Sequence, residues 1–245
     1  MNAVSPAVPG MAGWFHLAFF GLLIPWAAWH SRGRFERQPL PPRRRHFIAV
    51  LIQLVFFLVI SVAVARSEGI DLLALPQAGW IPWVAAAALL AAGLAGMAPV
   101  WRRGVERRER KLHLFMPRTR AERILWVAVA VAAGVSEEVT YRGVMFALVT
   151  GTTGSAAAGA VIASLIFGVS HIVQGWKSAA IITGIALLLH GLVVLSGTLL
   201  LAIAIHSIYD VAAGLAYGRI GEELGYPVDG LPPESDVSIA QPIPS

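Results

Sequence analysis

The sequence predicts an all-α integral membrane protein, a bundle of about seven transmembrane helices. Hydrophobic residues make up 57% of the 245 residues and charged residues only 13%, and the mean hydropathy is +0.69. This composition is too apolar for a water-soluble domain of this length. Cysteine is absent from the sequence, which excludes a disulfide framework, a thiol nucleophile and a cysteine-based metal site.

A helix needs about 20 mostly apolar residues to cross a bilayer, and seven segments of the chain meet that requirement. We expect them at about 11–30, 46–65, 79–101, 123–150, 155–175, 177–196 and 198–219. The first is expected to stay as an anchor and not to be removed as a signal peptide. No basic residue precedes it, and six arginines follow it between Arg32 and Arg45.

Basic residues set the predicted orientation, because Lys and Arg gather on the cytoplasmic side of membrane proteins. They are concentrated in the loop between the first and second segments and in the loop between the third and fourth. Those residues are Arg32, Arg34, Arg37, Arg43, Arg44 and Arg45, then Arg102, Arg103, Arg107, Arg108, Arg110, Lys111, Arg118 and Arg120. Between the second and third segments, Arg66 is balanced by Glu68 and Asp71. Seven spans then place the N-terminus outside and the C-terminus in the cytoplasm.

The same basic residues indicate the partners of the chain. Its net charge is +5 and its pI about 10.2, but the positive charge flanks membrane segments and forms no stripe on a soluble fold. We therefore expect contact with the lipid bilayer and no nucleic acid. The chain divides into a three-span region at 1–122 with basic cytoplasmic loops, a core at 123–220, and a tail at 221–245. The tail is acidic and contains prolines, so disorder is expected there.

Formal charges inside the apolar segments point to a functional site. A charge in mid-bilayer costs roughly 3 kcal/mol or more unless it is paired or solvated. Glu138 and Arg142 are four residues apart, so on a helix they share a face and can pair. Glu137 is turned about 100° away and can point at another group. A carboxylate in such a dry site is suited to act as a general base or acid.

Two later segments carry the remaining polar groups. Phe167 and His171 are four residues apart in the fifth segment, and His206 and Asp210 are four apart in the seventh, so each pair shares a helical face. Asp210 is expected to orient the ring of His206. The predicted segment boundaries put His206 about 12 Å from the outer end of its helix, so the seventh helix must sit deeper, tilt or kink to bring His206 to Glu137.

These residues form three motifs: Glu-Glu-x-x-x-Arg at 137–142, Phe-x-x-x-His at 167–171 and His-x-x-x-Asp at 206–210. Their order on separate apolar segments resembles the glutamate-dependent intramembrane proteases of the CAAX-protease and bacteriocin-processing (Abi) family. The third motif of that family ends in Asn or Asp. The resemblance covers about 123–219 and implies an endopeptidase that cuts a membrane-embedded or membrane-associated protein or peptide near the cytoplasmic face.

The resemblance also implies roles. Glu137 and His171 would activate a water molecule, while His206 and Asp210 would stabilise the oxyanion side of the tetrahedral intermediate. Glu138 would complete the catalytic group, and Arg142 would hold it, with Phe167 as a further structural support. An ionised Asp210 cannot donate a hydrogen bond as Asn would, so either it is protonated or it acts by orienting His206.

Several alternatives remain at the level of sequence. Zinc could be bound by Glu137, His171 and His206, but the chain has no His-Glu-x-x-His helix, so a site without a metal or other cofactor is favoured. A non-catalytic scaffold or bacteriocin-immunity protein, or a proton-coupled carrier, would also bury such groups. Arginine-rich, short loops favour the bacterial inner (plasma) membrane. His190, outside the three motifs, is expected to hydrogen-bond to a neighbouring helix.

Overall fold

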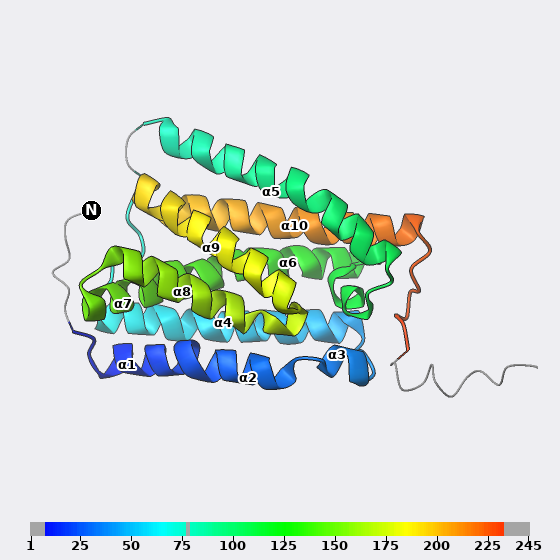
Figure 1. Ribbon diagram of the computed structural model, residues 1–245, viewed down its shortest axis with the longest axis horizontal. Helices are drawn as coiled ribbons and strands as arrows, with labels where there is room; N and C mark the ends of the chain where they lie inside the picture. Colours follow the sequence, from blue (N-terminus) through cyan, green and yellow to red (C-terminus); the bar gives the residue numbers. More distant parts are fainter. Residues whose placement is uncertain (1–7, 77–78, 233–245) are drawn as a thin grey trace, which may run out of the picture.

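A computed structural model describes residues 8–76 and 79–232 of the chain, and this part is all-α, with no strand. Helices α5, α10, α6, α4 and α2 lie side by side across the molecule, and α7, α8 and α9 cover one face of this layer (Figure 1). The elements are α1 Met11–Ala18, η1 Phe19–Leu23, α2 Ile24–Ser31, α3 Arg34–Arg37, α4 Arg43–Ser67, α5 Ile81–Glu106, η2 Arg110–Phe115, α6 Arg120–Glu137, η3 Glu138–Met145, α7 Phe146–Thr153, α8 Ala156–Ser170, η4 Ile172–Gln174, α9 Trp176–Ser196 and α10 Leu200–Glu223.

Within the described residues, six helical stretches are long and apolar enough to cross a membrane. They correspond to six of the seven predicted segments, and the protein is therefore an integral membrane protein with a helical fold. The fifth predicted segment, 155–175, forms only the 15-residue helix α8, which ends where η4 begins. The count of seven spans and the orientation of the termini stay predictions. Arg43 and His113, from the two basic loops, contact each other at 3.0 Å, so these loops meet at one end of the molecule.

The central stretch begins with a reciprocal cap. The Thr119 hydroxyl accepts from the backbone N–H of Glu122, and the Glu122 carboxylate accepts from the backbone N–H of Thr119. Such a capping box satisfies two N–H groups that the first turn of a helix leaves without partners. From there α6, the π-helical segment η3 and α7 run without a break to Thr153, over 34 residues. The wider turns of η3 begin at Glu138, and π-helical turns are frequent at functional sites.

Glycines allow α6 and α10 to pack closely. A Cβ atom at Gly134 of α6 would overlap the hydroxyl of Ser207 and would lie 3.0 Å from its backbone nitrogen. A Cβ atom at Gly214 of α10 would overlap the indole ring of Trp126. That indole donates its N–H to the carbonyl oxygen of Asp210 at 2.9 Å. Helices α6 and α10 are thus in close contact at Ser207, next to His206, and at Gly214.

The C-terminal segment corrects one expectation. We predicted disorder from 221 onward, but α10 continues to Glu223, and Tyr226 is only 3% exposed. The Tyr226 ring packs in a cluster with Val105, Leu112 and Met116, and its hydroxyl donates to the carbonyl oxygen of Glu109 at 3.0 Å. Burial of this aromatic ring orders the segment. The prediction of disorder rested on charge and proline content and did not include this contact. Residues 233–245 of the predicted tail lie outside the described part.

Candidate active site

The structure brings the three sequence motifs together at the junction of α6 and η3. Glu137 is the last residue of α6, and Glu138 and Arg142 lie in η3. His171 follows α8 directly as its C-cap, and His206 is the seventh residue of the 24-residue helix α10. All of these residues fall within contact distance of one another in the pairs described below. The depth difference between His206 and Glu137 that the segment boundaries suggested is absent, although α10 starts at Leu200, two residues later than predicted. The close packing of α10 against α6 brings His206 to Glu137.

Glu138 and Arg142 form the ion pair that their spacing predicts. Nη1 of Arg142 lies 3.2 Å from Oε1 of Glu138, and both side chains are 0% exposed. The guanidinium carbon lies 4.4 Å from the centroid of the Phe167 ring, in cation–π geometry. Pairing and ring contact together offset part of the cost of burying the two charges. Phe167 thus supports Arg142 as well as His171, whose ring centroid is 4.5 Å away.

Glu137 lies between two histidine rings. Its Oε1 is 4.0 Å from Nε2 of His171, and its Oε2 is 3.8 Å from Nε2 of His206. Nδ1 of His171 lies 2.8 Å from the carbonyl oxygen of Phe167. A carbonyl only accepts, so Nδ1 carries a proton, and in the neutral form of the ring Nε2 presents its lone pair to Glu137. A carboxylate and an imidazole lone pair thus face each other at a spacing that one water molecule can bridge by donating to both.

The ring of His206 is held chiefly by Glu138. Its Nδ1 lies 2.7 Å from Oε1 of Glu138, whereas its Nε2 lies 3.5 Å from Oδ2 of Asp210. Glu138 is paired with Arg142 and therefore accepts this hydrogen bond, so Nδ1 of His206 donates. We expected Asp210 to orient the ring. In the structure the shorter contact comes from Glu138, and Asp210 lies instead beside the nitrogen that faces Glu137.

Sequence reasoning missed three polar contacts that attach the site to its surroundings. The Ser136 hydroxyl donates to the carbonyl oxygen of Leu54 on α4 at 2.8 Å. The Tyr141 hydroxyl donates to Ser170, next to His171, at 3.4 Å. Trp126 donates to the backbone of Asp210, as described above. Each residue neighbours a motif residue or contacts its backbone, but serines and aromatic residues are common in such helices, and no spacing singles these out.

His190 behaves as the sequence predicts. It is 2% exposed on α9, and its Nδ1 lies 3.1 Å from the Ser164 hydroxyl on α8. The same nitrogen lies 3.1 Å from the carbonyl oxygen of Ala186, one turn earlier on its own helix. His190 therefore joins two packed helices.

The zinc alternative can be compared with this geometry. Glu137, His171 and His206 supply oxygen and nitrogen donors of the types that zinc accepts. Among the described residues, however, no group of three or more His, Asp or Glu side chains has an arrangement that could hold a metal ion. The donor types fit zinc, and the present spacing of their atoms does not.

Residues 119–212 match a family of proteins described as type II CAAX prenyl endopeptidase Rce1-like. The matched range begins at the N-cap of α6 and ends two residues after Asp210, so it contains all three motifs. The match agrees with the family resemblance that the motifs indicated. No curated protein and no solved structure matches the chain significantly.

Proposed function

We propose that this chain, whose residues 119–212 match the Rce1-like type II CAAX prenyl endopeptidase family, is an intramembrane endopeptidase of the glutamate type. It would hydrolyse a peptide bond in a membrane-embedded or membrane-associated protein or peptide. The observation that carries this proposal is the position of Glu137, whose two carboxylate oxygens lie 4.0 and 3.8 Å from the Nε2 atoms of His171 and His206.

In the proposed reaction, Glu137 and His171 hold a water molecule between them. The water oxygen attacks the carbonyl carbon of the substrate while Glu137 takes one of its protons, and the same proton later passes to the leaving amine. Charge develops on the carbonyl oxygen as the tetrahedral intermediate forms. With both ring nitrogens protonated, the N–H on Nε2 of His206, which lies beside Asp210 before the reaction, would donate to that oxyanion and stabilise it without a change in ring orientation.

Glu138 and Arg142 have a positioning role in this scheme. Glu138 holds Nδ1 of His206 at 2.7 Å, so the opposite nitrogen points at Glu137 and the substrate. Arg142 keeps Glu138 ionised and in place. Fixed ring orientation matters because a displacement of about 1 Å at a reacting group costs on the order of 100-fold in rate.

The proposed reaction uses no metal and no other cofactor. A metal chelator separates this scheme from the zinc alternative, because a zinc enzyme loses activity when it is stripped and regains it when zinc is returned. We expect the purified protein to keep its activity after dialysis against a chelator, as measured by hydrolysis of a membrane peptide in vesicles. Loss of activity that only added zinc restores would contradict this scheme and would show that Glu137 acts as a zinc ligand.

The test of the proposal is Glu137→Gln, which keeps the shape of the side chain and removes the base. Wild-type and variant proteins are expressed at equal levels, and membrane peptides and protein termini are compared. We expect new termini with wild type only, because loss of a general base lowers the rate by about 100-fold to 10,000-fold. Glu223→Gln, at a side chain that is 52% exposed, is the matched control and should cut like wild type.

Equal cleavage by Glu137→Gln would contradict the proposed chemistry. No new terminus with wild type, while both proteins are folded in the membrane, would favour the non-catalytic scaffold or immunity function. The bilayer itself is a required partner in this assay, since the site lies among membrane-spanning helices.

A further inference from the structure

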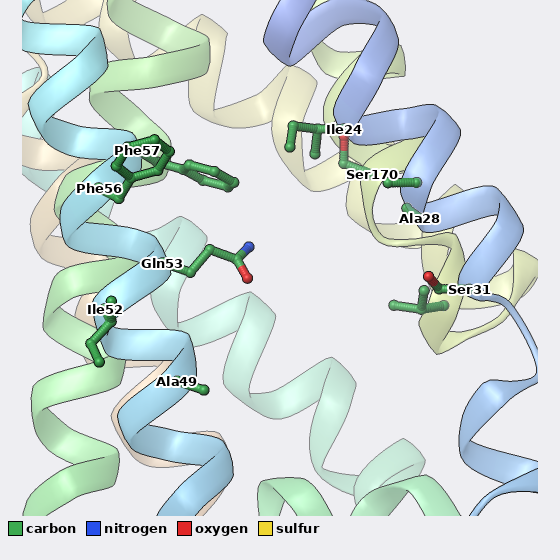
Figure 2. Close-up of a pocket in the computed structure, with 11 residues that line it drawn as sticks. Ile24, Ala28, Ser31, Ala49, Ile52, Gln53, Phe56, Phe57 and Ser170 are labelled. Atoms are coloured by element: carbon green, nitrogen blue, oxygen red, sulfur yellow. The ribbon is translucent and has the colours of Figure 1, made fainter.

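A groove opens on the side of the bundle between α2, α4 and the end of α8. Its volume is about 620 Å³, and its walls are mainly apolar. Figure 2 shows α4 on one side and α2 on the other, with Ser170 behind them. The apolar lining includes Ile24, Ala28, Ile52, Phe56, Phe57 and Val173.

Gln53 is the polar exception on the α4 wall, and its amide points into the space between the helices (Figure 2). It lies ten residues into α4, about 15 Å from the beginning of that helix at 1.5 Å per residue. Its amide has no hydrogen-bond partner among residues 8–76 and 79–232. A primary amide at this depth in a membrane-spanning helix is costly unless something in the groove accepts from it and donates to it.

Three occupants can be compared by their ability to pair with that amide. A lipid acyl chain has no polar group at this depth. An unbroken transmembrane helix satisfies its own backbone N–H and C=O groups internally. A segment in which Gly or Pro breaks the helix leaves a backbone N–H and C=O unpaired, and these match the donor and acceptor of one glutamine side chain. The third occupant is the one that Gln53 complements.

The walls of the groove are also connected to Glu137 and His171, the two residues that hold the water molecule in the proposed reaction. Leu54, next to Gln53, accepts a hydrogen bond at 2.8 Å from Ser136, the residue before Glu137. Ser170, which lines the groove, is the residue before His171 and accepts from Tyr141 at 3.4 Å. A segment in the groove thus touches the residue that precedes His171, and Leu54 and Ser136 connect the α4 wall of the groove to Glu137. An extended backbone is also what hydrolysis needs, because a helix shields its peptide carbonyls.

We infer that this groove docks an apolar membrane segment of the substrate at a point where Gly or Pro breaks its helix, and that Gln53 hydrogen-bonds to the exposed peptide unit. The inference rests on the proposed function and specifies its substrate class. Recognition is of an unpaired backbone and not of a particular sequence, so a designed peptide is a sufficient probe.

The test is photo-crosslinking in phosphatidylcholine vesicles, with full-length protein that carries Glu137→Gln so that the peptide stays intact. A photoreactive phenylalanine derivative replaces Ile52 in the groove or, as the matched control, Val55, which lies about 60° around the same helix and does not line the groove; these are 65% and 50% exposed. Two biotinylated Leu/Ala peptides of about 24 residues are compared. One is uninterrupted, and the other has Gly-Pro at its centre.

We expect the Gly-Pro peptide to label the Ile52 position about fivefold more strongly than the uninterrupted peptide does, as one added hydrogen bond allows. Labelling at the Val55 position should be weak and equal for both peptides. Gln53→Leu should remove the preference for Gly-Pro while the melting temperature of the protein stays unchanged. Retention of the preference in Gln53→Leu would overturn the role of Gln53.

Other outcomes would overturn the docking site as a whole. They are equal crosslinking from the two protein positions, equal crosslinking to the two peptides, and no crosslinking to either peptide. Crosslinking from the Ile52 position to phospholipid alone would likewise overturn it. The readout is binding and needs no turnover, so these failures leave the endopeptidase proposal intact. Conversely, absence of cleavage by wild-type protein together with selective labelling would refute the endopeptidase and keep the docking site.

Discussion

Glu137 and Glu138 are neighbours in the sequence, but their side chains have different surroundings and therefore different roles. Glu138 is 0% exposed and paired with Arg142, whereas the side chain of Glu137 is 19% exposed and its two oxygens lie near the Nε2 atoms of His171 and His206. The 100° step of a helix between successive residues separates the two carboxylates in this way. One supports the structure of the site, and the other is free to react.

This difference predicts opposite effects of the same substitution. Glu138→Gln leaves the buried charge of Arg142 without a partner, which should destabilise the protein by about 3–5 kcal/mol. Glu137→Gln should leave stability near that of wild type. Thermal unfolding of the purified proteins in lipid vesicles measures both effects.

The double variant Glu138→Gln with Arg142→Met provides the control for this prediction. Removing both charges should restore much of the melting temperature that Glu138→Gln loses, without restoring activity. Equal melting temperatures for Glu138→Gln and wild type would show that the pair contributes little to stability.

Between elements, the contact of α6 with α10 decides where His206 lies. A Cβ atom at Gly134 would meet the Ser207 hydroxyl and would lie 3.1 Å from the carbonyl oxygen of Ile203. Backbone atoms cannot move aside as a flexible side chain can, so a larger residue at Gly134 must push the helices apart. His206 stands next to Ser207, and the shift would move its ring away from Glu137.

Gly134→Ala is therefore expected to lower the rate of peptide hydrolysis by about tenfold or more, because of the displacement of a catalytic group. Gly191→Ala, on α9, is the matched control, since a Cβ atom there meets nothing within 4 Å. That variant should be neutral or slightly stabilising, as alanine favours a helix over glycine by up to about 1 kcal/mol. Rates and melting temperatures of both variants check the prediction, and an active Gly134→Ala would contradict it.

Across the whole molecule, much of the fold and the site was predictable, because both depend on local features. Apolar runs of sufficient length form helices wherever they lie, and a spacing of four places Glu138 beside Arg142 in any helix. The contact of His206 with Glu138 depends on how α10 packs against η3, which no local pattern encodes. Burial of Tyr226 likewise depends on residues more than a hundred positions earlier, so a local reading of its segment failed.

The contacts of His113, which lies in η2 between α5 and α6, should make stability depend on pH. His113 is 4% exposed, and its Nδ1 accepts from Arg43 at 3.0 Å. Burial, together with the nearby charge of Arg43, lowers the pKa of His113 from 6.5 to about 4, although Glu122 acts in the opposite direction. Above pH 6.5 the ring is neutral in both the folded and unfolded states, and its full contribution to stability is present.

Between pH 6.5 and about 4 the unfolded chain takes up a proton that the folded protein does not, so stability should fall as pH falls. Below about pH 4 this contribution changes no further. Melting temperatures of wild type and His113→Gln, recorded from pH 7.5 to 4, isolate it, because other groups titrate equally in both proteins. We expect a steeper decline in wild type, and parallel curves would contradict this origin.

If the proposed peptide hydrolysis takes place at Glu137, the charges around it also restrict where a substrate can be cut. Three carboxylates, those of Glu137, Glu138 and Asp210, surround the two histidines, and the guanidinium of Arg142 and the imidazolium that the proposed mechanism assigns to His206 offset only part of their charge. A free C-terminal carboxylate about 4 Å from such groups would be repelled by several kcal/mol at the effective dielectric constant of a protein. The last peptide bond of a chain is therefore a poor fit, and the bond that fits lies far enough from the end to keep that terminal charge outside.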